Sequence, residues 1–83
     1  MNERQRRTNL TPAERSRLDR WEPRTLARVI HPNYGMVVVP HRSNLAALMN
    51  AAEVWGCDWV TVTDAQVWRA EPGDVPAPMP YLI

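Results

Sequence analysis

The stretch from residue 43 to residue 56 constrains the fold more than any other part of this sequence. Ser43 can cap a helix, because its hydroxyl oxygen can accept a hydrogen bond from an amide of the first turn. Gly56 stands where a helix commonly ends in the left-handed conformation. Between them, apolar residues recur at helical spacing and form one stripe: Leu45, Leu48, Met49, Ala52 and Trp55. The opposite positions are Ala46, Asn50 and Glu53. The pattern predicts a helix over residues 43–55 with one face on a sheet and the other in water.

The segment before this helix has the pattern of a β-hairpin. Residues 26–31 and 36–39 are β-prone runs, and the turn-forming residues 32–35 separate them. A turn over these four residues predicts a pairing register, in which the facing residues are His31 with Met36, Arg28 with Val39, and Leu26 with His41.

A helix from residue 23 to residue 30 is the competing interpretation of the same segment. Leu26, Val29 and Ile30 also share one helical face, so periodicity alone allows both structures. Pro32 would end either element.

Two further segments carry strand signals. Residues 58–63 alternate tryptophan and threonine with valine, which is typical of a strand. Residues 64–71 are ambiguous, because Thr63 and Gln66 could form a capping box while Val67 and Trp68 suit a strand. A strand is the favoured interpretation of residues 64–71.

The N-terminal part predicts a short helix. Thr11 can cap it, Pro12 suits the first helical position, and Glu14 can complete a capping box. The helix should end near Trp21, because Pro23 disfavours helical geometry in the residue before it.

These segments together predict one small α+β domain. An N-terminal helix precedes a small antiparallel sheet of three to four strands, which packs against the central helix at residues 43–55. The domain should cover residues 11–71, after a disordered basic arm at residues 1–10. Residues 72–83, which are rich in proline, should form an extended C-terminal tail.

Charge is sorted along the chain. Residues 1–42 hold nine of the ten arginines and four carboxylates, whereas residues 43–83 hold Arg69 and five carboxylates. Such asymmetry indicates contacts with charged macromolecules rather than a catalytic centre. Ten arginines and no lysine are also what a GC-rich genome would encode.

The candidate catalytic residues do not form a recognisable constellation. His31 and His41 would lie too far apart along the hairpin to share a metal ion. Cys57 would follow a helix C-terminus, where the helix dipole does not favour a thiolate. We therefore expect no enzyme activity, no metal site and no cofactor.

The favoured function is that of a small non-catalytic interaction or regulatory protein that binds and modulates another protein, or self-associates. Its small size suits an accessory protein of a phage or another mobile element. The expected protein-contact residues are Tyr34, Trp68, Tyr81, Leu82 and Ile83. The alternative is a nucleic-acid-binding transcriptional regulator, which would use Arg4, Arg6, Arg7, Arg24, Arg28 and Arg42.

Composition also predicts a location. A single cysteine allows no internal disulfide, and the N-terminus has no apolar stretch that could act as a secretory signal. The longest strongly apolar run, at residues 36–39, is far too short to span a membrane. We therefore expect a cytoplasmic protein that does not bind membranes.

Overall fold

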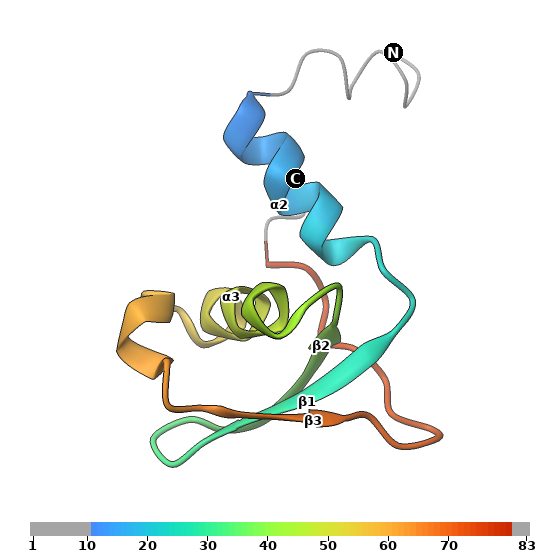
Figure 1. Ribbon diagram of the computed structural model, residues 1–83, viewed down its shortest axis with the longest axis vertical. Coiled ribbons are helices and arrows are strands. Elements are labelled where there is room, and N and C mark those ends of the chain that lie inside the picture. The colour runs from blue at the N-terminus through green and yellow to red at the C-terminus, as the bar shows by residue number, and fades with distance from the viewer. Residues whose placement is uncertain (1–10, 81–83) are drawn as a thin grey trace.

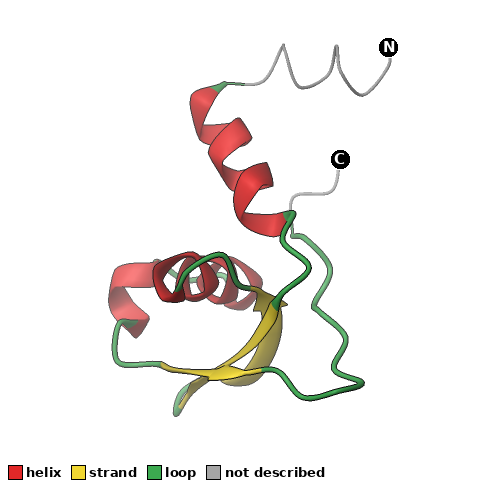
Figure 2. Ribbon diagram, turned by 45° about the vertical axis from the view of Figure 1, so that its right-hand side comes forward, coloured by secondary structure: helices red, strands yellow, loops and turns green. Residues whose placement is uncertain are grey.

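The computed structural model describes residues 11–80 of the 83-residue chain as an α+β fold, which confirms the predicted fold class. Within these residues the elements follow one another as α2 Pro12–Trp21, β1 Leu26–His31, β2 Gly35–Pro40, α3 Asn44–Trp55, the 3₁₀ helix η1 Trp59–Val62, and β3 Gln66–Arg69. The three strands form one antiparallel sheet in the order β2-β1-β3. Helix α3 covers one face of this sheet, and α2 rises away from it (Figures 1 and 2).

Both ends of α3 have the predicted caps. The Ser43 hydroxyl accepts a hydrogen bond from the Ala46 amide at 3.0 Å. Gly56 ends the helix with a φ of 76°, and its amide donates to the Ala52 carbonyl. A residue with a Cβ atom is strained at this φ, so glycine is the residue best suited to this position.

The predicted division of α3 into a buried and a solvated face is wrong at three positions. Ala46 and Asn50, which we expected on the solvated side, are buried, whereas Leu45 is exposed. The reason is that α3 is enclosed on two sides, by the sheet and by α2, as the polar contacts below show. The sequence prediction assumed that only the sheet covers α3, so it assigned residues that lie under α2 to the solvated face.

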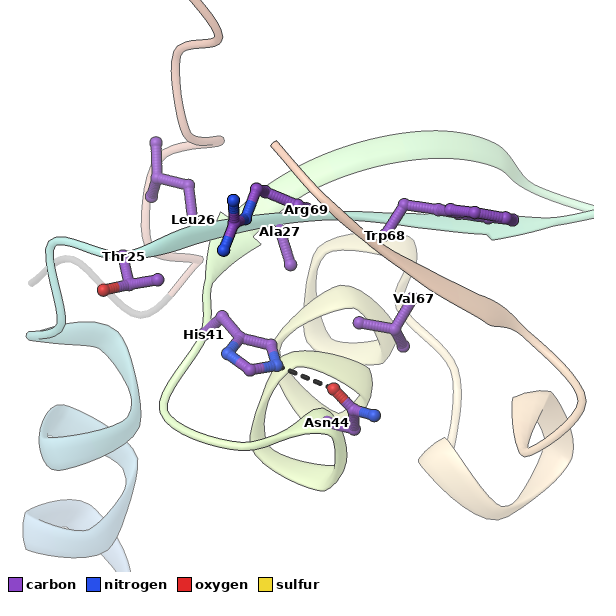
Figure 3. A pocket seen from close by; sticks show the side chains of 8 residues that line it. All are labelled: Thr25, Leu26, Ala27, His41, Asn44, Val67, Trp68 and Arg69. Atoms are coloured by element: carbon purple, nitrogen blue, oxygen red, sulfur yellow. Dashed lines mark hydrogen bonds between the residues drawn. The ribbon is translucent and has the colours of Figure 1, made fainter. Parts of the chain in front are cut away.

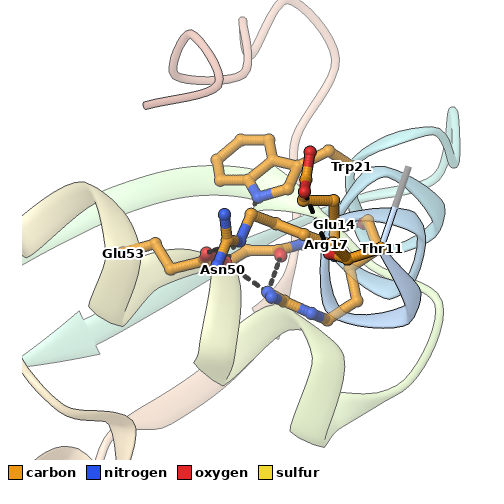
Figure 4. Close-up of polar contacts among 7 residues, drawn as sticks. Thr11, Glu14, Arg17, Trp21, Asn50 and Glu53 are labelled. Atoms are coloured by element: carbon orange, nitrogen blue, oxygen red, sulfur yellow. Dashed lines mark hydrogen bonds and ion pairs between the residues drawn. The ribbon is translucent and has the colours of Figure 1, made fainter. Parts of the chain in front are cut away.

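A network of polar side chains holds α2 against α3 (Figure 4). The fully buried Asn50 side chain donates to the carbonyls of Arg20 and Pro40, both at 3.0 Å. Its Oδ1 accepts from Arg20 Nη1 at 2.9 Å. The Glu53 carboxylate pairs with Arg20 and with Arg17, and it accepts from the Trp21 indole at 3.4 Å. Asn50 of α3 therefore links α2 to β2 through hydrogen bonds. These bonds also satisfy its buried amide group, which would otherwise lack partners.

The hairpin is confirmed, but its predicted register is wrong by one residue. His31 faces Gly35, Arg28 faces Val38, and Leu26 faces Pro40. Three residues rather than four connect the strands: the Tyr34 amide bonds to the His31 carbonyl at 3.2 Å, and Gly35 has a φ of 84°. The positive φ of Gly35 lets the second strand begin one residue earlier than we predicted.

The strand predicted at residues 58–63 is wrong, because η1 occupies this segment. Asp58 caps η1, since its carboxylate accepts from the Val60 amide at 3.4 Å. The Asp58 carbonyl also accepts from the amide and the hydroxyl of Thr61, at 3.0 and 2.6 Å. These local bonds favour a helical turn over the alternation of valine and threonine. The third strand instead lies at β3, within the segment for which we favoured a strand.

The core lies between the sheet and α3. Val29 and Val39 of the sheet pack against Ala47 and Ala51 of the helix, and Val62 of η1 closes the side of this cluster. All five side chains are fully buried. Small alanines on α3 allow the helix to approach the sheet closely.

Residues 70–80 follow β3 as a proline-rich segment that crosses to the opposite edge of the sheet. The Asp74 carboxylate binds Arg28 Nε at 2.7 Å and Nη2 at 2.9 Å, on the face of the sheet away from α3. The Ala77 amide then donates to the Val38 carbonyl at 2.8 Å. The segment is therefore anchored to β1 by charge and to β2 through its backbone.

Candidate binding edge of the sheet

The backbone hydrogen bonds of β1 fix which strand residues face an edge. The carbonyl of Thr25 accepts from the His41 amide at 2.8 Å, and the carbonyl of Leu26 accepts from the Ala70 amide at 3.3 Å. Bonded and non-bonded pairs alternate along antiparallel strands. Odd-numbered residues of β1 therefore bond to β2, and even-numbered residues bond to β3.

The same alternation leaves the outer edge of β3 open. Trp68 pairs with Arg28 as a bonded pair, so the backbone N–H and C=O groups of Val67 and Arg69 point away from the sheet. Within residues 11–80, no other segment hydrogen bonds to these four groups. An open edge of this kind is a template for an additional strand.

Three features obstruct the outer edge of β2 near its C-terminal end. The Val38 carbonyl is bonded to Ala77, as described above. Pro40 has no amide hydrogen, and its carbonyl is bonded to the Asn50 side chain. A partner strand therefore meets open backbone groups along β3, whereas at β2 the tail and Asn50 occupy the carbonyls of Val38 and Pro40, which leaves the outward groups of Met36 and the Val38 amide.

A pocket of about 220 Å³ adjoins the C-terminal end of β3, between this strand and the start of α3 (Figure 3). The side chain of Arg69 extends into the space between Thr25 and His41. His41 Nε2 lies 2.7 Å from Asn44 Oδ1. Because an amide oxygen only accepts, Nε2 carries the hydrogen and Nδ1 remains for another partner. The pocket thus presents a guanidinium and an imidazole nitrogen to a ligand.

The pocket lies at one end of the sheet, where three arginines are found; we call it the basic end. Arg69 is exposed, and the exposed residues Arg24 and Arg42 lie next in sequence to the lining residues Thr25 and His41. Among residues 11–80, no carboxylate forms an ion pair with these three arginines. Arg20 and Arg28, in contrast, are neutralised by carboxylates. The uncompensated positive charge favours an anionic ligand.

The face of the sheet away from α3 carries an apolar patch formed by one residue of each strand. Ile30 is 37% exposed, Met36 is 51% exposed and Trp68 is 58% exposed. Ile30 and Met36 face each other across the hairpin. The Trp68 indole donates to Gln66 Oε1 at 3.0 Å, which holds the ring beside the open edge. Large apolar side chains grouped in this way are typical of contact surfaces.

The hairpin turn forms a separate aromatic cluster at the other end of α3. The Tyr34 ring stacks on Trp55, with centroids 5.1 Å apart and an interplanar angle of 11°. His31 adjoins both rings, at 5.7 and 6.3 Å. Hydrogen bonding with Cys57 raises the pKa of the Tyr34 hydroxyl, and the negative charge of a Cys57 thiolate and burial raise it further. Tyr34 is thus engaged within its own domain.

His31 is not placed to activate Cys57. Its Nδ1 accepts from the Asn33 amide at 3.1 Å, and its Nε2 donates to Asp64 Oδ1 at 2.9 Å. Both ring nitrogens are therefore engaged, and the imidazole is 4% exposed. No group of three histidine, cysteine or acidic residues within the described part of the chain is arranged to hold a metal ion.

The predicted contact residues are distributed over different surfaces. Trp68 lies at the open edge, whereas Tyr34 lies at the hairpin turn. Of the predicted nucleic-acid contacts, Arg24 and Arg42 lie at the basic end, and Arg28 is held by Asp74 and Glu71 on the opposite face from α3. The remaining predicted residues lie outside the described residues: Arg4, Arg6, Arg7, Tyr81, Leu82 and Ile83.

Sequence reasoning missed the residues that define the open edge. Val67 appeared only as a strand former, and Arg69 only as the single arginine of the acidic half. The one local signal was the alternation of Val67, Trp68 and Arg69, which places the first and third side chains on one face. Edge exposure depends on the strand order β2-β1-β3, which local patterns do not reveal.

No protein-family model matches this chain, and comparisons with curated proteins and with solved structures found no match. Neither α2 nor α3 in the described region has the length and apolar character needed to cross a membrane.

Proposed function

We propose that this chain is a small non-catalytic interaction protein, which binds and modulates another protein by pairing its β3 strand with an extended segment of that protein. The observation that carries the proposal is the contrast between the two edges of the sheet. Backbone groups of Val67 and Arg69 are open along one edge, while Ala77, Pro40 and Asn50 obstruct the C-terminal part of the other. Strand addition to an open edge is an established mode of peptide recognition.

The exposed patch of Ile30, Met36 and Trp68 supports this proposal. It borders the open edge, so one or two side chains of a segment paired with β3 would lie on the same face as Trp68 and beside it. Aromatic residues are frequent anchors of protein interfaces.

The same proposal gives a role to the N-terminal helix and to the proline-rich tail. The N-terminal helix would hold Asn50 and Pro40 in place, and the proline-rich tail would block the β2 edge. Obstruction of part of the β2 edge would disfavour the assembly of such modules into longer sheets. The proposed location is the cytoplasm.

A matched pair of variants at Val67 tests the proposed function. Val67→Pro removes the outward amide hydrogen and does not disturb bonds to β1, since that amide faces the edge. Val67→Ala removes the same apolar contacts and keeps the amide. The full chain and both variants are used to capture proteins from a lysate of the source cells, after circular dichroism has shown that all three fold.

We expect the wild type and Val67→Ala to retain the same partner, and Val67→Pro to lose it. Equal capture by Val67→Pro would show that the edge is not the contact. A wild-type chain that stays monomeric and retains no partner would also refute the proposal.

The alternative function, nucleic-acid binding through the arginines named above, has less support. Arg28 is bound on two sides by carboxylates, which leaves it little charge to offer a phosphate. A gel-shift assay at low salt tests this alternative, because phosphate contacts weaken steeply as salt rises.

A further inference from the structure

We propose that the segment bound at β3 carries a carboxylate, which enters the pocket beside Arg69 and pairs with its guanidinium. This inference rests on the proposed function, because it names the chemistry of the segment that pairs with the open edge. The carboxylate can belong to an aspartate or glutamate side chain or to the C-terminus of the partner.

The first argument is the position of the pocket relative to the edge. Arg69 supplies both an outward backbone pair and a side chain that extends into the pocket (Figure 3). A segment paired with Arg69 therefore passes directly beside the pocket. One of its side chains must point to the same face as Arg69, because side chains alternate along a strand.

The second argument is the chemistry inside the pocket. The Arg69 guanidinium presents a planar fork of N–H donors that fits the two oxygens of a carboxylate. His41 keeps Nδ1 available, since its Nε2 is bonded to Asn44. The lining thus offers the donors of Arg69 to the carboxylate, while His41 Nδ1 can accept a hydrogen bond from an N–H or O–H group of the same segment.

The third argument is the surrounding charge. Arg24 and Arg42 are exposed next to the pocket, and neither forms an ion pair with a carboxylate of the described residues. An anionic segment would supply the negative charge that the basic end of the sheet lacks. A basic segment would be repelled.

The alternation also predicts the residues beside the carboxylate. Val67 and Arg69 point to the α3 side of the sheet, whereas Trp68 points to the other side. The neighbours of an acidic residue seated at Arg69 would therefore lie next to Trp68. We expect an apolar residue at one or both of these neighbouring positions.

Other occupants fit these observations less well. A second copy of this chain, paired through β3, would bring a second Arg69 to the same groove. A nucleic acid would supply negative charge, but it has no peptide groups to pair with the backbone of Val67 and Arg69.

Panning of peptide libraries on the full-length chain tests the inference. One library presents random segments within a longer chain, and the other presents random segments with a free C-terminus. The selected peptide is then synthesised and titrated by fluorescence anisotropy against the wild type, Arg69→Gln, Arg69→Lys and Val67→Pro. A second peptide, in which the acidic residue is changed to its amide or the C-terminus is amidated, is titrated against the same proteins. The two peptides and the wild type with Arg69→Gln then form a double-mutant cycle.

We expect selection of an acidic residue next to an apolar one, or of a free C-terminus. Arg69→Gln should weaken binding about tenfold, which is typical of losing a charged hydrogen bond. Arg69→Lys should lose less, because it keeps the charge without the fork. With Arg69→Gln, the acidic peptide and its amide counterpart should bind equally.

The outcomes separate this inference from the function on which it rests. Selected peptides that lack a carboxylate, or that bind Arg69→Gln as well as the wild type, would overturn the inference. The proposed function would survive that result if Val67→Pro still abolished binding. Equal binding by Val67→Pro would overturn both. Saturable binding of an oligonucleotide that competes with the peptide at Arg69, or dimerisation through β3 in sedimentation, would overturn the inference.

Discussion

Asp74 and Arg28 form a two-point ion pair across 46 positions of sequence, with Oδ2 at 2.7 Å from Nε and Oδ1 at 2.9 Å from Nη2. The Asp74 carboxylate also accepts from the Glu71 amide at 2.9 Å. These bonds fold residues 71–74 onto the face of the sheet away from α3. They direct the tail toward β2, where the Ala77 amide bonds to the outward carbonyl of Val38.

The ion pair predicts an acid-dependent loss of stability. Hydrogen bonds from Arg28 and from the Glu71 amide, helped by the charge of Arg28, lower the pKa of Asp74 from 3.8 to about 2. The ionised carboxylate therefore stabilises the fold fully above its ordinary pKa, and this contribution is lost as the pH falls through about 2. The difference in thermal midpoint between the wild type and Asp74→Asn should be largest near neutral pH and should shrink below pH 4. The double variant Arg28→Gln/Asp74→Asn should be less destabilised than the sum of the single changes, and strict additivity would contradict the pairing.

Loss of the buried Asn50 amide should strongly lower the stability of the fold. Its replacement by alanine leaves the carbonyls of Arg20 and Pro40 without their donor. We expect the free energy of unfolding to fall by about 2 to 4 kcal/mol, as measured by urea denaturation. Asn33→Ala, at an exposed turn position, is the control and should change it by less than about 0.5 kcal/mol. Similar effects at both positions would refute the role of Asn50 in joining α2 to the core.

The aromatic cluster predicts a shifted tyrosine titration. Hydrogen bonding with Cys57 is the main cause that raises the pKa of Tyr34 above 10.0. In a Tyr81→Phe background, ultraviolet titration should follow Tyr34 alone. Cys57→Ala should lower the pKa of Tyr34 toward its ordinary value, whereas Cys57→Ser should keep part of the shift. An unchanged titration in Cys57→Ala would show that the two groups do not interact.

Features fixed by local chemistry could be predicted from the sequence. Ser43 and Gly56 set both ends of α3 because each acts on backbone groups within a few residues. The same kind of local bond misled the prediction where it was overlooked, since Asp58 caps η1 in a segment that alternates like a strand. The hairpin register was wrong by one residue because Gly35 shortens the connection.

The candidate site was accessible to prediction only in part. Trp68 stood out as a large aromatic residue near the end of the chain, and it does lie exposed beside the edge. The importance of Val67 and Arg69 depends on which strand is outermost, and that order results from contacts between distant segments. The bonds of Asp74 to Arg28 and of Ala77 to Val38 are equally non-local, so the obstruction of the β2 edge could not be predicted.

Residue-resolved amide hydrogen exchange tests the central claim most directly. In the free chain, the amide of Trp68 should be protected by its bond to β1, while the amides of Val67 and Arg69 should exchange rapidly. When the selected acidic peptide binds, the amides of Val67 and Arg69 should become protected. Protection of these two amides in the free chain, or their continued rapid exchange in the saturated complex, would contradict pairing at the open edge of β3.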